Sequence, residues 1–276
     1  MDQYCVLGNP VEHSRSPWIH ARFGQLTGQQ LHYAKRLIPL AGFGQGLRAF
    51  RAEGGKGCNI TVPFKFEAAG FATMLTGRAR LAQASNTLRF DGERDVFADN
   101  TDGVGLVNDI QHNAAVALAQ RDVLLIGAGG AAAGVLGPLI EARPRRIVVV
   151  NRTPDKASSL VRQHRALASE FGVELAASSL TSMAGSFDIV INATASSLSG
   201  AGVPVTGSVL KPRALAYDMM YGPAANGFME WARRHGAVPR DGLGMLVEQA
   251  AEAFLVFRGV RPPSAQVLAE LRASLG

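Results

Sequence analysis

The feature that most constrains this chain is the stretch Asp122-Val-Leu-Leu-Ile-Gly-Ala-Gly-Gly-Ala-Ala132. Its apolar first half predicts a buried strand, and its second half predicts a glycine-rich turn that leads into a helix. Gly127, Gly129 and Ala132 fit the G-x-G-x-x-G/A pattern of dinucleotide-binding proteins. The first glycine permits a tight turn, the second lets backbone N–H groups approach a pyrophosphate, and the small alanine lets the helix pack closely on the strand. The stretch therefore predicts a dinucleotide site at a helix N-terminus, where the helix dipole favours an anion.

The end of the next apolar run, residues 147–150, indicates which dinucleotide is bound. NAD sites usually place Asp or Glu there, about 20 residues after the turn, to bind the ribose 2′-hydroxyl. This chain has Asn151 and Arg152 instead, and Lys156 follows one helical turn later. A guanidinium binds a 2′-phosphate through two N–H groups, whereas a carboxylate would repel it. We therefore predict NADP as the cofactor; the alternative is an ordinary strand-to-helix turn with Arg152 as a solvated surface residue.

Length and composition are those of a globular protein, and they do not indicate a nucleic-acid partner. The 276 residues suffice for one large or two smaller domains, and 47% of them are hydrophobic and 18% charged. The net charge of +6 would suit nucleic acid, but the basic residues are scattered and are not interleaved with aromatic ones. We therefore expect small anionic ligands and no nucleic-acid partner.

The two cysteines, Cys5 and Cys58, form no CxxC or Cys/His cluster, so no structural metal or disulfide framework is expected. The N-terminus lacks a signal-peptide core, and we expect a cytoplasmic location. Residues 123–140 are uncharged and long enough to suggest a membrane span, but their glycines and Pro138 favour the strand, turn and helix.

Apolar runs that alternate with helical patterns predict an α/β fold with two domains. The expected strands and hairpin strands cover residues 4–7, 31–37, 57–60, 87–90, 95–98, 123–126, 147–150, 187–191 and 214–217. The expected helices cover residues 17–25, 42–51, 101–111, 243–257 and 264–275. The first of these helices is expected to begin with Ser16 as N-cap and Pro17 at the first helical position. The strands after residue 121 are continuously apolar, which indicates a parallel sheet buried on both faces.

We expect an N-terminal open α/β substrate domain, residues 1–101, and a doubly wound Rossmann domain, residues 102–240. The C-terminal helices, residues 241–276, are expected to return to the substrate domain. Because no flexible linker separates the halves, we expect them to pack across a cleft.

Four polar clusters follow or flank strands of the N-terminal half, where open α/β sheets bind ligands. They are His13–Pro17, Asn59–Lys65, Ala84–Thr87 and Asp99–Gly103. A residue in each of three clusters has an ordinary explanation when taken alone, whereas Ser14 has none. Ser16 is expected as a helix cap, Lys65 as a solvated lysine, and Asp102 as a favourable charge in a first helical turn.

Together these motifs resemble the shikimate dehydrogenase family over essentially the whole chain. Any one motif is common, but the ordered set is specific to this family. In order, they are His13-Ser-x-Ser-Pro17, Asn59-x-Thr-Val-Pro-x-Lys65, Asn86-Thr87, Asp99-Asn-Thr-Asp-Gly103, Gly127-Ala-Gly-Gly-Ala131, Asn151-Arg-Thr153, Asn192-Ala-Thr194, Asp218-Met-x-Tyr221 and Gly242-Leu-Gly-Met-Leu-x-x-Gln249.

The resemblance implies a role for each matching residue. Lys65 and Asp102 would be the catalytic pair. Ser14 and Ser16 would hold the substrate carboxylate. The residues implied at the substrate ring are Thr61, Asn86, Asp102 and Gln249, with Asn59 nearby and Tyr221 lining the site. The residues implied around NADP are Gly127, Ala128, Gly129, Gly130, Ala131, Asn151, Arg152, Thr153, Lys156, Thr194, Met219 and Gly242.

The implied reaction is the reversible NADP-dependent reduction of 3-dehydroshikimate to shikimate, a step of aromatic amino-acid biosynthesis. No metal is expected, because the cofactor performs the redox chemistry. The alternatives are a quinate/shikimate or aminoshikimate dehydrogenase and a non-catalytic NADP-binding regulator. The protein is expected to be a monomer or homodimer without a membrane partner. The chain departs from the family at Glu12, Ala21, Gly77, Ser85 and Ala133.

Overall fold

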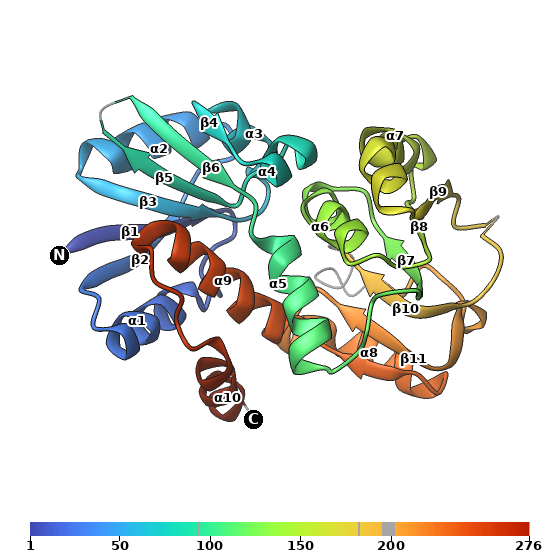
Figure 1. The fold of residues 1–276 in the computed structure, drawn as a ribbon. Helices are drawn as coiled ribbons and strands as arrows, with labels where there is room; N and C mark the ends of the chain where they lie inside the picture. The colour runs from blue at the N-terminus through green and yellow to red at the C-terminus, as the bar shows by residue number, and fades with distance from the viewer. Residues whose placement is uncertain (93, 182, 195–201, 276) are drawn as a thin grey trace. The chain divides into compact units, whose positions relative to one another are not determined.

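The computed structural model describes residues 1–92, 94–181, 183–194 and 202–275. Figure 1 shows the fold, in which the chain divides into two units. The N-terminal unit contains Met1–Gly105 and Val247–Gly276, and the central unit contains Leu106–Leu246. The chain passes from one unit to the other within helix α5 (Asp102–Asn108) and again within helix α9 (Leu243–Arg258). The predicted α/β class with two domains is confirmed; the exact boundaries after residues 101 and 240 stay predictions.

The N-terminal unit contains a mixed six-stranded sheet in the order β2-β1-β3-β5-β6-β4. Its strands are β1 (Asp2–Gly8), β2 (Leu31–Leu37), β3 (Gly55–Ile60), β4 (Met74–Leu75), β5 (Thr87–Asp91) and β6 (Asp95–Asp99). Its other helices are α1 (Ser16–Thr27), α2 (Phe43–Ala52), α3 (Lys65–Gly70), α4 (Gly77–Ala82) and α10 (Ser264–Leu275). Alternate residues of β1 point to opposite faces. Leu7 packs with Phe43 and Phe50 of α2, and Tyr4 packs with Phe257 of α9, so helices cover both faces.

The directions of three strands place the polar clusters at one edge of this sheet. β5 is antiparallel to both β3 and β6, so β3 and β6 run in the same direction. β1 is parallel to β3. The carboxyl ends of β1, β3 and β6 and the amino end of β5 therefore share one edge, and the four clusters predicted from the sequence are attached to these ends.

The central unit contains a parallel six-stranded sheet in the order β12-β11-β10-β7-β8-β9. The strands are β7 (Asp122–Ile126), β8 (Arg146–Val150), β9 (Glu174–Ser178), β10 (Phe187–Asn192), β11 (Leu210–Asp218) and β12 (Val238–Arg240). Numbered along the unit, this is the doubly wound order 3-2-1-4-5-6 of a Rossmann fold, which confirms that prediction. The order reverses between β7 and β10, where such sheets bind dinucleotides.

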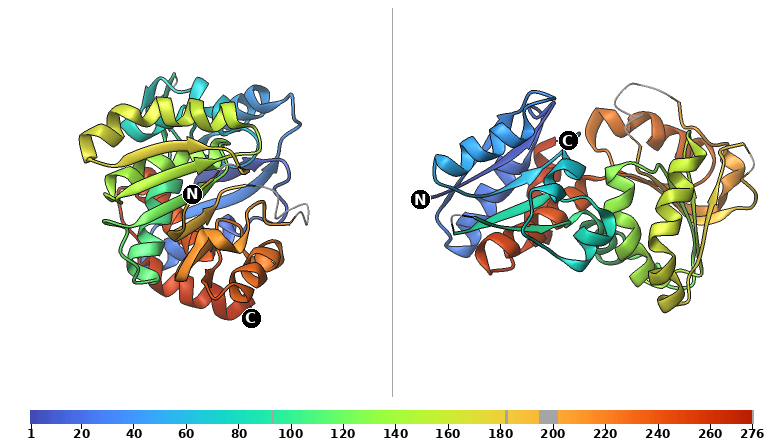
Figure 2. Two further views of the ribbon diagram at one scale, coloured as in Figure 1. Left: turned by 90° about the vertical axis from the view of Figure 1, so that its right-hand side faces the viewer. Right: turned by 90° about the horizontal axis from the view of Figure 1, so that it is seen from above.

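Helices cover both faces of this sheet as well. Figure 2 shows α6 (Gly130–Glu141) and α7 (Pro154–Phe171) side by side next to β7, β8 and β9. α8 (Asn226–Arg234) packs on Leu124 and Val190 through Phe228 and Trp231. Short helical turns occur at η1 (Asp109–Asn113), η3 (Gly207–Val209) and η4 (Gly222–Ala225). Within the described ranges, no helix combines the length and apolar character needed to cross a bilayer.

One local prediction is wrong, and the structure refines a second. Arg15, not Ser16, is the N-cap of α1, and Ser16 already lies inside the helix. The reason is that Ser14 precedes the helix and its hydroxyl accepts the N–H of Ser16 at 3.3 Å. The helix predicted at residues 101–111 ends at Asn108 and continues as the π-helical turn η1. In that turn the buried Asp109 carboxylate binds Asn113 and two side chains of the sheet.

Candidate active site

Lys65 and Asp102 form an ion pair at the polar edge of the N-terminal sheet. Each is the first residue of a helix, Lys65 of α3 and Asp102 of α5. The Lys65 Nζ atom lies 2.5 Å from Asp102 Oδ2, and the two side chains are only 15% and 7% exposed. The Asp102 carboxylate therefore fixes the position of the Lys65 ammonium group at this edge of the sheet.

Asn86 connects this pair to the C-terminal helix α9. Its Nδ2 atom donates to Asp102 Oδ1 at 2.9 Å and lies 3.3 Å from Gln249 Oε1. Its Oδ1 atom accepts the backbone N–H of Thr101 at 2.9 Å. The structure thus brings together Asn86, which immediately precedes β5, Asp102 of α5 and Gln249 of α9. Their contact with a substrate stays a prediction.

Asn59 of β3 is a buried neighbour of Asn86. Its Oδ1 atom accepts the hydroxyl of Tyr33 at 2.7 Å, and its Nδ2 atom donates to the Asn86 carbonyl at 3.1 Å and to Thr87 Oγ1 at 3.0 Å. These protein partners use both ends of the amide. Asn59 therefore braces the backbone of Asn86, and Tyr33, which the sequence analysis missed, braces Asn59.

Ser14, Ser16 and Thr61 lie at the same sheet edge. The Ser14 hydroxyl lies 3.2 Å from Ser16 Oγ, beside the N-terminus of the 12-residue helix α1. Thr61 follows β3, and its N–H donates to the carbonyl of Leu7 at 2.9 Å. A Cβ atom at Gly8 would lie 2.2 Å from the Thr61 methyl group, so only glycine permits this close approach.

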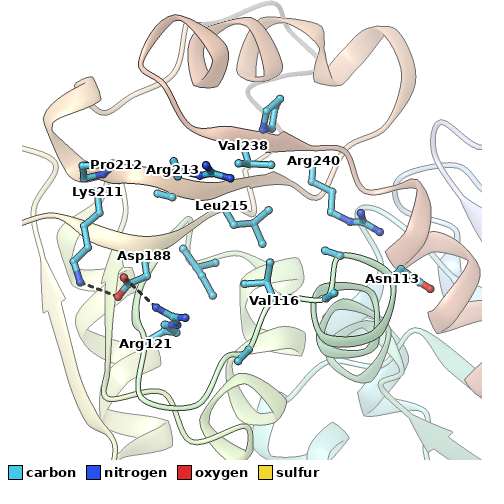
Figure 3. Close-up of a pocket in the computed structure, with 16 residues that line it drawn as sticks. Asn113, Val116, Arg121, Asp188, Lys211, Pro212, Arg213, Leu215, Val238 and Arg240 are labelled. Atoms are coloured by element: carbon cyan, nitrogen blue, oxygen red, sulfur yellow. Dashed lines mark hydrogen bonds and ion pairs between the residues drawn. The ribbon is translucent and has the colours of Figure 1, made fainter.

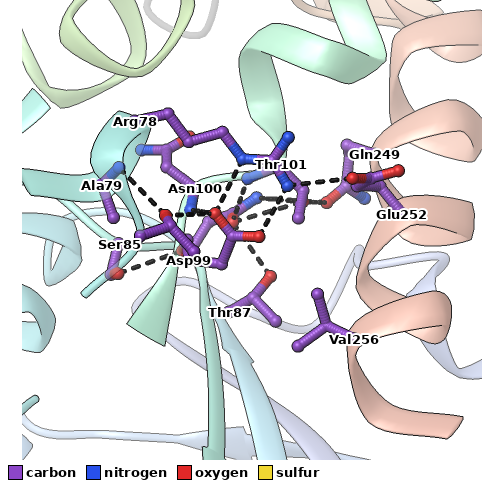
Figure 4. A network of polar contacts seen from close by, with 12 residues as sticks. Arg78, Ala79, Ser85, Thr87, Asp99, Asn100, Thr101, Gln249, Glu252 and Val256 are labelled. Atoms are coloured by element: carbon purple, nitrogen blue, oxygen red, sulfur yellow. Dashed lines mark hydrogen bonds and ion pairs between the residues drawn. The ribbon is translucent and has the colours of Figure 1, made fainter. Parts of the chain in front are cut away.

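An ion-pair network holds the segment that carries Asp102, as Figure 4 shows. The Arg78 guanidinium binds both oxygens of the buried Asp99 carboxylate, at 2.7 and 2.6 Å, and reaches Glu252 of α9 at 2.9 Å. Burial opposes ionisation of Asp99, but the Arg78 contacts prevail and lower its pKa. Asp99 Oδ1 also accepts the N–H of Asn100 at 2.7 Å, which fixes the chain two residues before Asp102.

Ser85 departs from the family pattern without leaving a buried polar group unpaired. It is fully buried, and its hydroxyl donates to the carbonyl of Asp99 at 3.0 Å. The serine therefore adds a bond to the same segment that Arg78 holds.

His20 is a buried histidine behind Ser16. Its ring stacks on Tyr33 with a centroid distance of 4.2 Å, and its Nε2 atom has no hydrogen-bond partner among the described residues. Burial lowers the pKa of His20 from its usual 6.5 to about 3.

His20 makes the protein acid-sensitive. Between pH 6.5 and about 3 the unfolded chain binds a proton at His20 that the folded chain does not, so stability falls as the pH falls. The expected slope from this one group is about 1.4 kcal/mol per pH unit. His20→Phe keeps the stacked ring and should flatten the pH dependence of the unfolding free energy measured in urea. The exposed His32→Gln variant should not; equal acid sensitivity in His20→Phe would contradict this account.

In the central unit, the glycine-rich turn has the geometry that a dinucleotide needs. Gly127 has φ +119°, a left-handed conformation, and a Cβ atom on it would lie 3.0 Å from the carbonyl oxygen of Ala193. A Cβ atom on Gly129 would have no neighbour within 4 Å, so this side of the backbone is open to a phosphate. Ala133 makes the first intrahelical bond of α6, to Gly129, and N–H groups before such a bond have no intrahelical partner.

The cofactor residues predicted after β8 lie at the same edge of the central sheet. Asn151 bonds the carbonyl of Thr153 at 3.0 Å, and Arg152 and Lys156 are exposed. Asp155, in the first turn of α7, is the one acidic residue of this segment. A basic, exposed strand end of this kind fits a 2′-phosphate.

A hydrogen-bonded network joins the ends of β10 and β11. Asn192 accepts the Thr194 hydroxyl at 2.7 Å and lies 3.3 Å from the Asp218 carboxylate. A Cβ atom on Gly242 would lie 2.3 Å from the carbonyl oxygen of Met219, so these two predicted cofactor residues are in direct contact. Tyr221 also belongs to the central unit, and its contact with a substrate stays a prediction. In the described part of the chain, no three His, Cys, Asp or Glu side chains are grouped to hold a metal ion.

Three family models match the chain. They are the shikimate dehydrogenase substrate binding domain at residues 6–88, shikimate/quinate 5-dehydrogenase at residues 109–203, and the shikimate 5'-dehydrogenase C-terminal domain at residues 242–272. The shikimate dehydrogenase (NADP(+)) of Acidovorax sp. (strain JS42) is 66% identical over 99% of this chain and 97% of its own length. That of Herminiimonas arsenicoxydans is 54% identical over 99% and 98%.

Two solved structures are similar to the chain over nearly its whole length. An Ael1 enzyme from Pseudomonas putida has a TM-score of 0.89 and 44% identity, with 98% of each chain covered. The shikimate 5-dehydrogenase of Thermus thermophilus, in complex with NADP(H) and shikimate, has a TM-score of 0.85 and 29% identity, with both chains fully covered at 100%.

Proposed function

The chain belongs to the shikimate dehydrogenase family, and we propose that it interconverts 3-dehydroshikimate and shikimate with NADP as the hydride carrier. The observation that carries the proposal is the Lys65–Asp102 ion pair, which lies next to the amides of Asn86 and Gln249. A ring with several hydroxyls needs donors and acceptors at fixed places, and a site built of such groups rejects analogues that leave one unpaired.

Each end of the substrate has residues suited to it. Ser14 and Ser16, beside the N-terminus of α1, hold the carboxylate through two hydroxyls and the helix dipole. Thr61, Asn86 and Gln249 bind ring hydroxyls together with Asp102. Asn59 supports Asn86 from behind, because its own amide is occupied by protein groups.

Lys65 moves the proton. Bound NADPH would supply the hydride that reduces the ketone, and Lys65 would supply the proton. Charge then develops on the substrate oxygen, and the Lys65 ammonium stabilises that charge and donates the proton. Asp102 holds the Nζ atom in place. In the oxidation direction, neutral Lys65 accepts the hydroxyl proton.

The cofactor residues lie along the carboxyl edge of the central sheet. The backbone from Gly127 to Ala131 binds the pyrophosphate. Asn151, Arg152, Thr153 and Lys156 bind the adenosine 2′-phosphate. Thr194, Met219 and Gly242 complete the site, with Met219 at the nicotinamide. The test of the function is the absorbance of NADPH mixed with the purified protein and 3-dehydroshikimate: oxidation is expected, and its absence would contradict the proposal.

Arg152 sets the preference for NADP over NAD. Arg152→Ala should raise the KM for NADP⁺ by about 10- to 100-fold, the value of a charge-assisted bond to phosphate, and leave the KM for NAD⁺ nearly unchanged. Arg165→Ala is the matched control, because Arg165 is an exposed arginine of α7, the helix that follows Arg152. An equal loss with both cofactors would show that Arg152 does not bind the 2′-phosphate.

The intact Lys65–Asp102 pair disfavours a non-catalytic NADP-binding regulator, and Arg152 disfavours an NAD-dependent quinate enzyme. We further propose that the protein works in the cytoplasm as a monomer or homodimer. The free thiols of Cys5 and Cys58, whose strands pair at these two residues, are consistent with a reducing compartment. Light scattering would measure the mass in solution.

A further inference from the structure

A second candidate ligand site lies in the central unit, at the amino ends of strands. It is a cavity of about 450 Å³, a size typical of small-molecule sites, and Figure 3 shows it. The cavity is lined by residues at the amino ends of three strands, starting with Asp188 in β10, Lys211 in β11 and Val238 in β12. The segment 113–117 lines another side. The glycine-rich turn follows the carboxyl end of β7, so this cavity is separate from the cofactor residues.

The cavity combines an apolar wall with positive charge. Val116, Ile189, Leu215 and Val238 supply the apolar surface. The charged lining residues are four cations and one acid, namely Arg121, Lys211, Arg213, Arg240 and Asp188.

Two of the four cations already have strong partners. Lys211 Nζ lies 2.8 Å from carboxylate oxygens of both Asp122 and Asp188. Arg240 binds both oxygens of Asp109. Arg121 is weakly paired, 3.8 Å from Asp188, and Arg213 forms no hydrogen bond or ion pair with any described residue. Arg213, with help from Arg121, is therefore available to an anion.

The backbone of β11 is irregular where Arg213 occurs. Phe187 pairs with Leu210 and Ile189 pairs with Leu215, so residues 211–214 face the single residue Asp188. Arg213 has φ +59°, a left-handed conformation that L-residues other than Asn and Asp seldom adopt. Bulges change the direction of a side chain, and backbone strain tends to persist where a site uses it.

We propose that this cavity binds a small organic anion, with its apolar body against Val116, Leu215 and Val238 and its carboxylate or phosphate at Arg213 and Arg121. A bare inorganic ion would leave the apolar wall uncovered, and a neutral apolar molecule would leave Arg213 unpaired. A ligand with both parts therefore uses the cavity most fully.

The test is ligand-observed NMR of the full chain with NADP⁺ and shikimate present at saturating concentrations, so that the candidate active site is occupied. The probes are phthalate, phenyl phosphate and inorganic phosphate. Phthalate or phenyl phosphate should bind with a Kd of about 1 mM or below, and inorganic phosphate at least about tenfold more weakly. Whichever aromatic probe has the lower Kd indicates whether the natural ligand carries a carboxylate or a phosphate.

Arg213→Gly is the decisive variant, because glycine accepts the left-handed backbone and the fold should be retained. It should weaken the aromatic probes by about tenfold or more and leave turnover unchanged. Arg162→Ala, an exposed arginine of α7, is the control with the same charge change. No binding at about 10 mM, equal binding by Arg213→Gly, or inorganic phosphate binding as tightly as the aromatic probes would each overturn the proposal.

Discussion

Lys65→Ala should lower the turnover number by about 10²- to 10⁴-fold, which is the usual contribution of a positioned proton donor. The dissociation constant of shikimate should change little, because the carboxylate and ring contacts assigned to Ser14, Asn86 and Gln249 remain. The loss should therefore be in kcat, since the role we propose for the Lys65 ammonium is to stabilise charge that develops only in the transition state.

Two further variants separate the proton from the charge. Lys65→Arg keeps a cation beside Asp102 but the guanidinium does not release its proton, so turnover should stay low. Lys56→Ala removes an exposed lysine of the same unit and should retain wild-type turnover. Calorimetry with shikimate and initial rates of NADPH formation measure both quantities. Near-normal turnover of Lys65→Ala would remove the basis of the proposed mechanism.

Arg78→Ala should destabilise the protein by about 3–5 kcal/mol, the usual effect of removing one partner from a buried ion pair. Asp99 is 2% exposed and would lose two of its hydrogen bonds, and Glu252 would lose its contact to α4. Because Asp99 also fixes the backbone just before Asp102, kcat should fall as well.

The matched control is Arg80→Ala, an exposed arginine two residues further along α4. Urea unfolding at pH 7 should show the loss for Arg78→Ala and almost none for Arg80→Ala. The lowered pKa of Asp99 means that the Arg78 contribution is present at neutral pH and is lost as the pH falls below the usual carboxyl range, near pH 4. Equal stability of the two variants at pH 7 would contradict the assigned role.

Strands that are continuously apolar could be predicted from the sequence alone, and β7, β8 and β10 are confirmed. β9, with the sequence Glu-Leu-Ala-Ala-Ser, was missed because it is a partly exposed edge strand without an apolar run. β4 and β12 contain only two and three residues and are too short for a periodic pattern.

The residue types of the candidate site were likewise visible in the sequence, but their roles came from the family resemblance. The topology explains why they meet: β5 is antiparallel to both β3 and β6, so Asn59, Asn86 and Asp102 come to one edge. The ion pairs of Arg78 could not be predicted from the sequence, because its partners Asp99 and Glu252 are 21 and 174 residues away along the chain. The role of the Tyr33 hydroxyl could not be predicted either, because Tyr33 lies in a strand whose sequence indicates only core packing.

The most direct test of the central claim is one assay with four combinations. The initial rate of reduced-cofactor formation is measured with shikimate and with quinate, each offered NADP⁺ and NAD⁺. The account predicts the highest kcat/KM for shikimate with NADP⁺, because we propose that Arg152 binds the 2′-phosphate and that Asn86 and Gln249 bind the shikimate ring. Activity only with quinate and NAD⁺, or with none of the four, would contradict it.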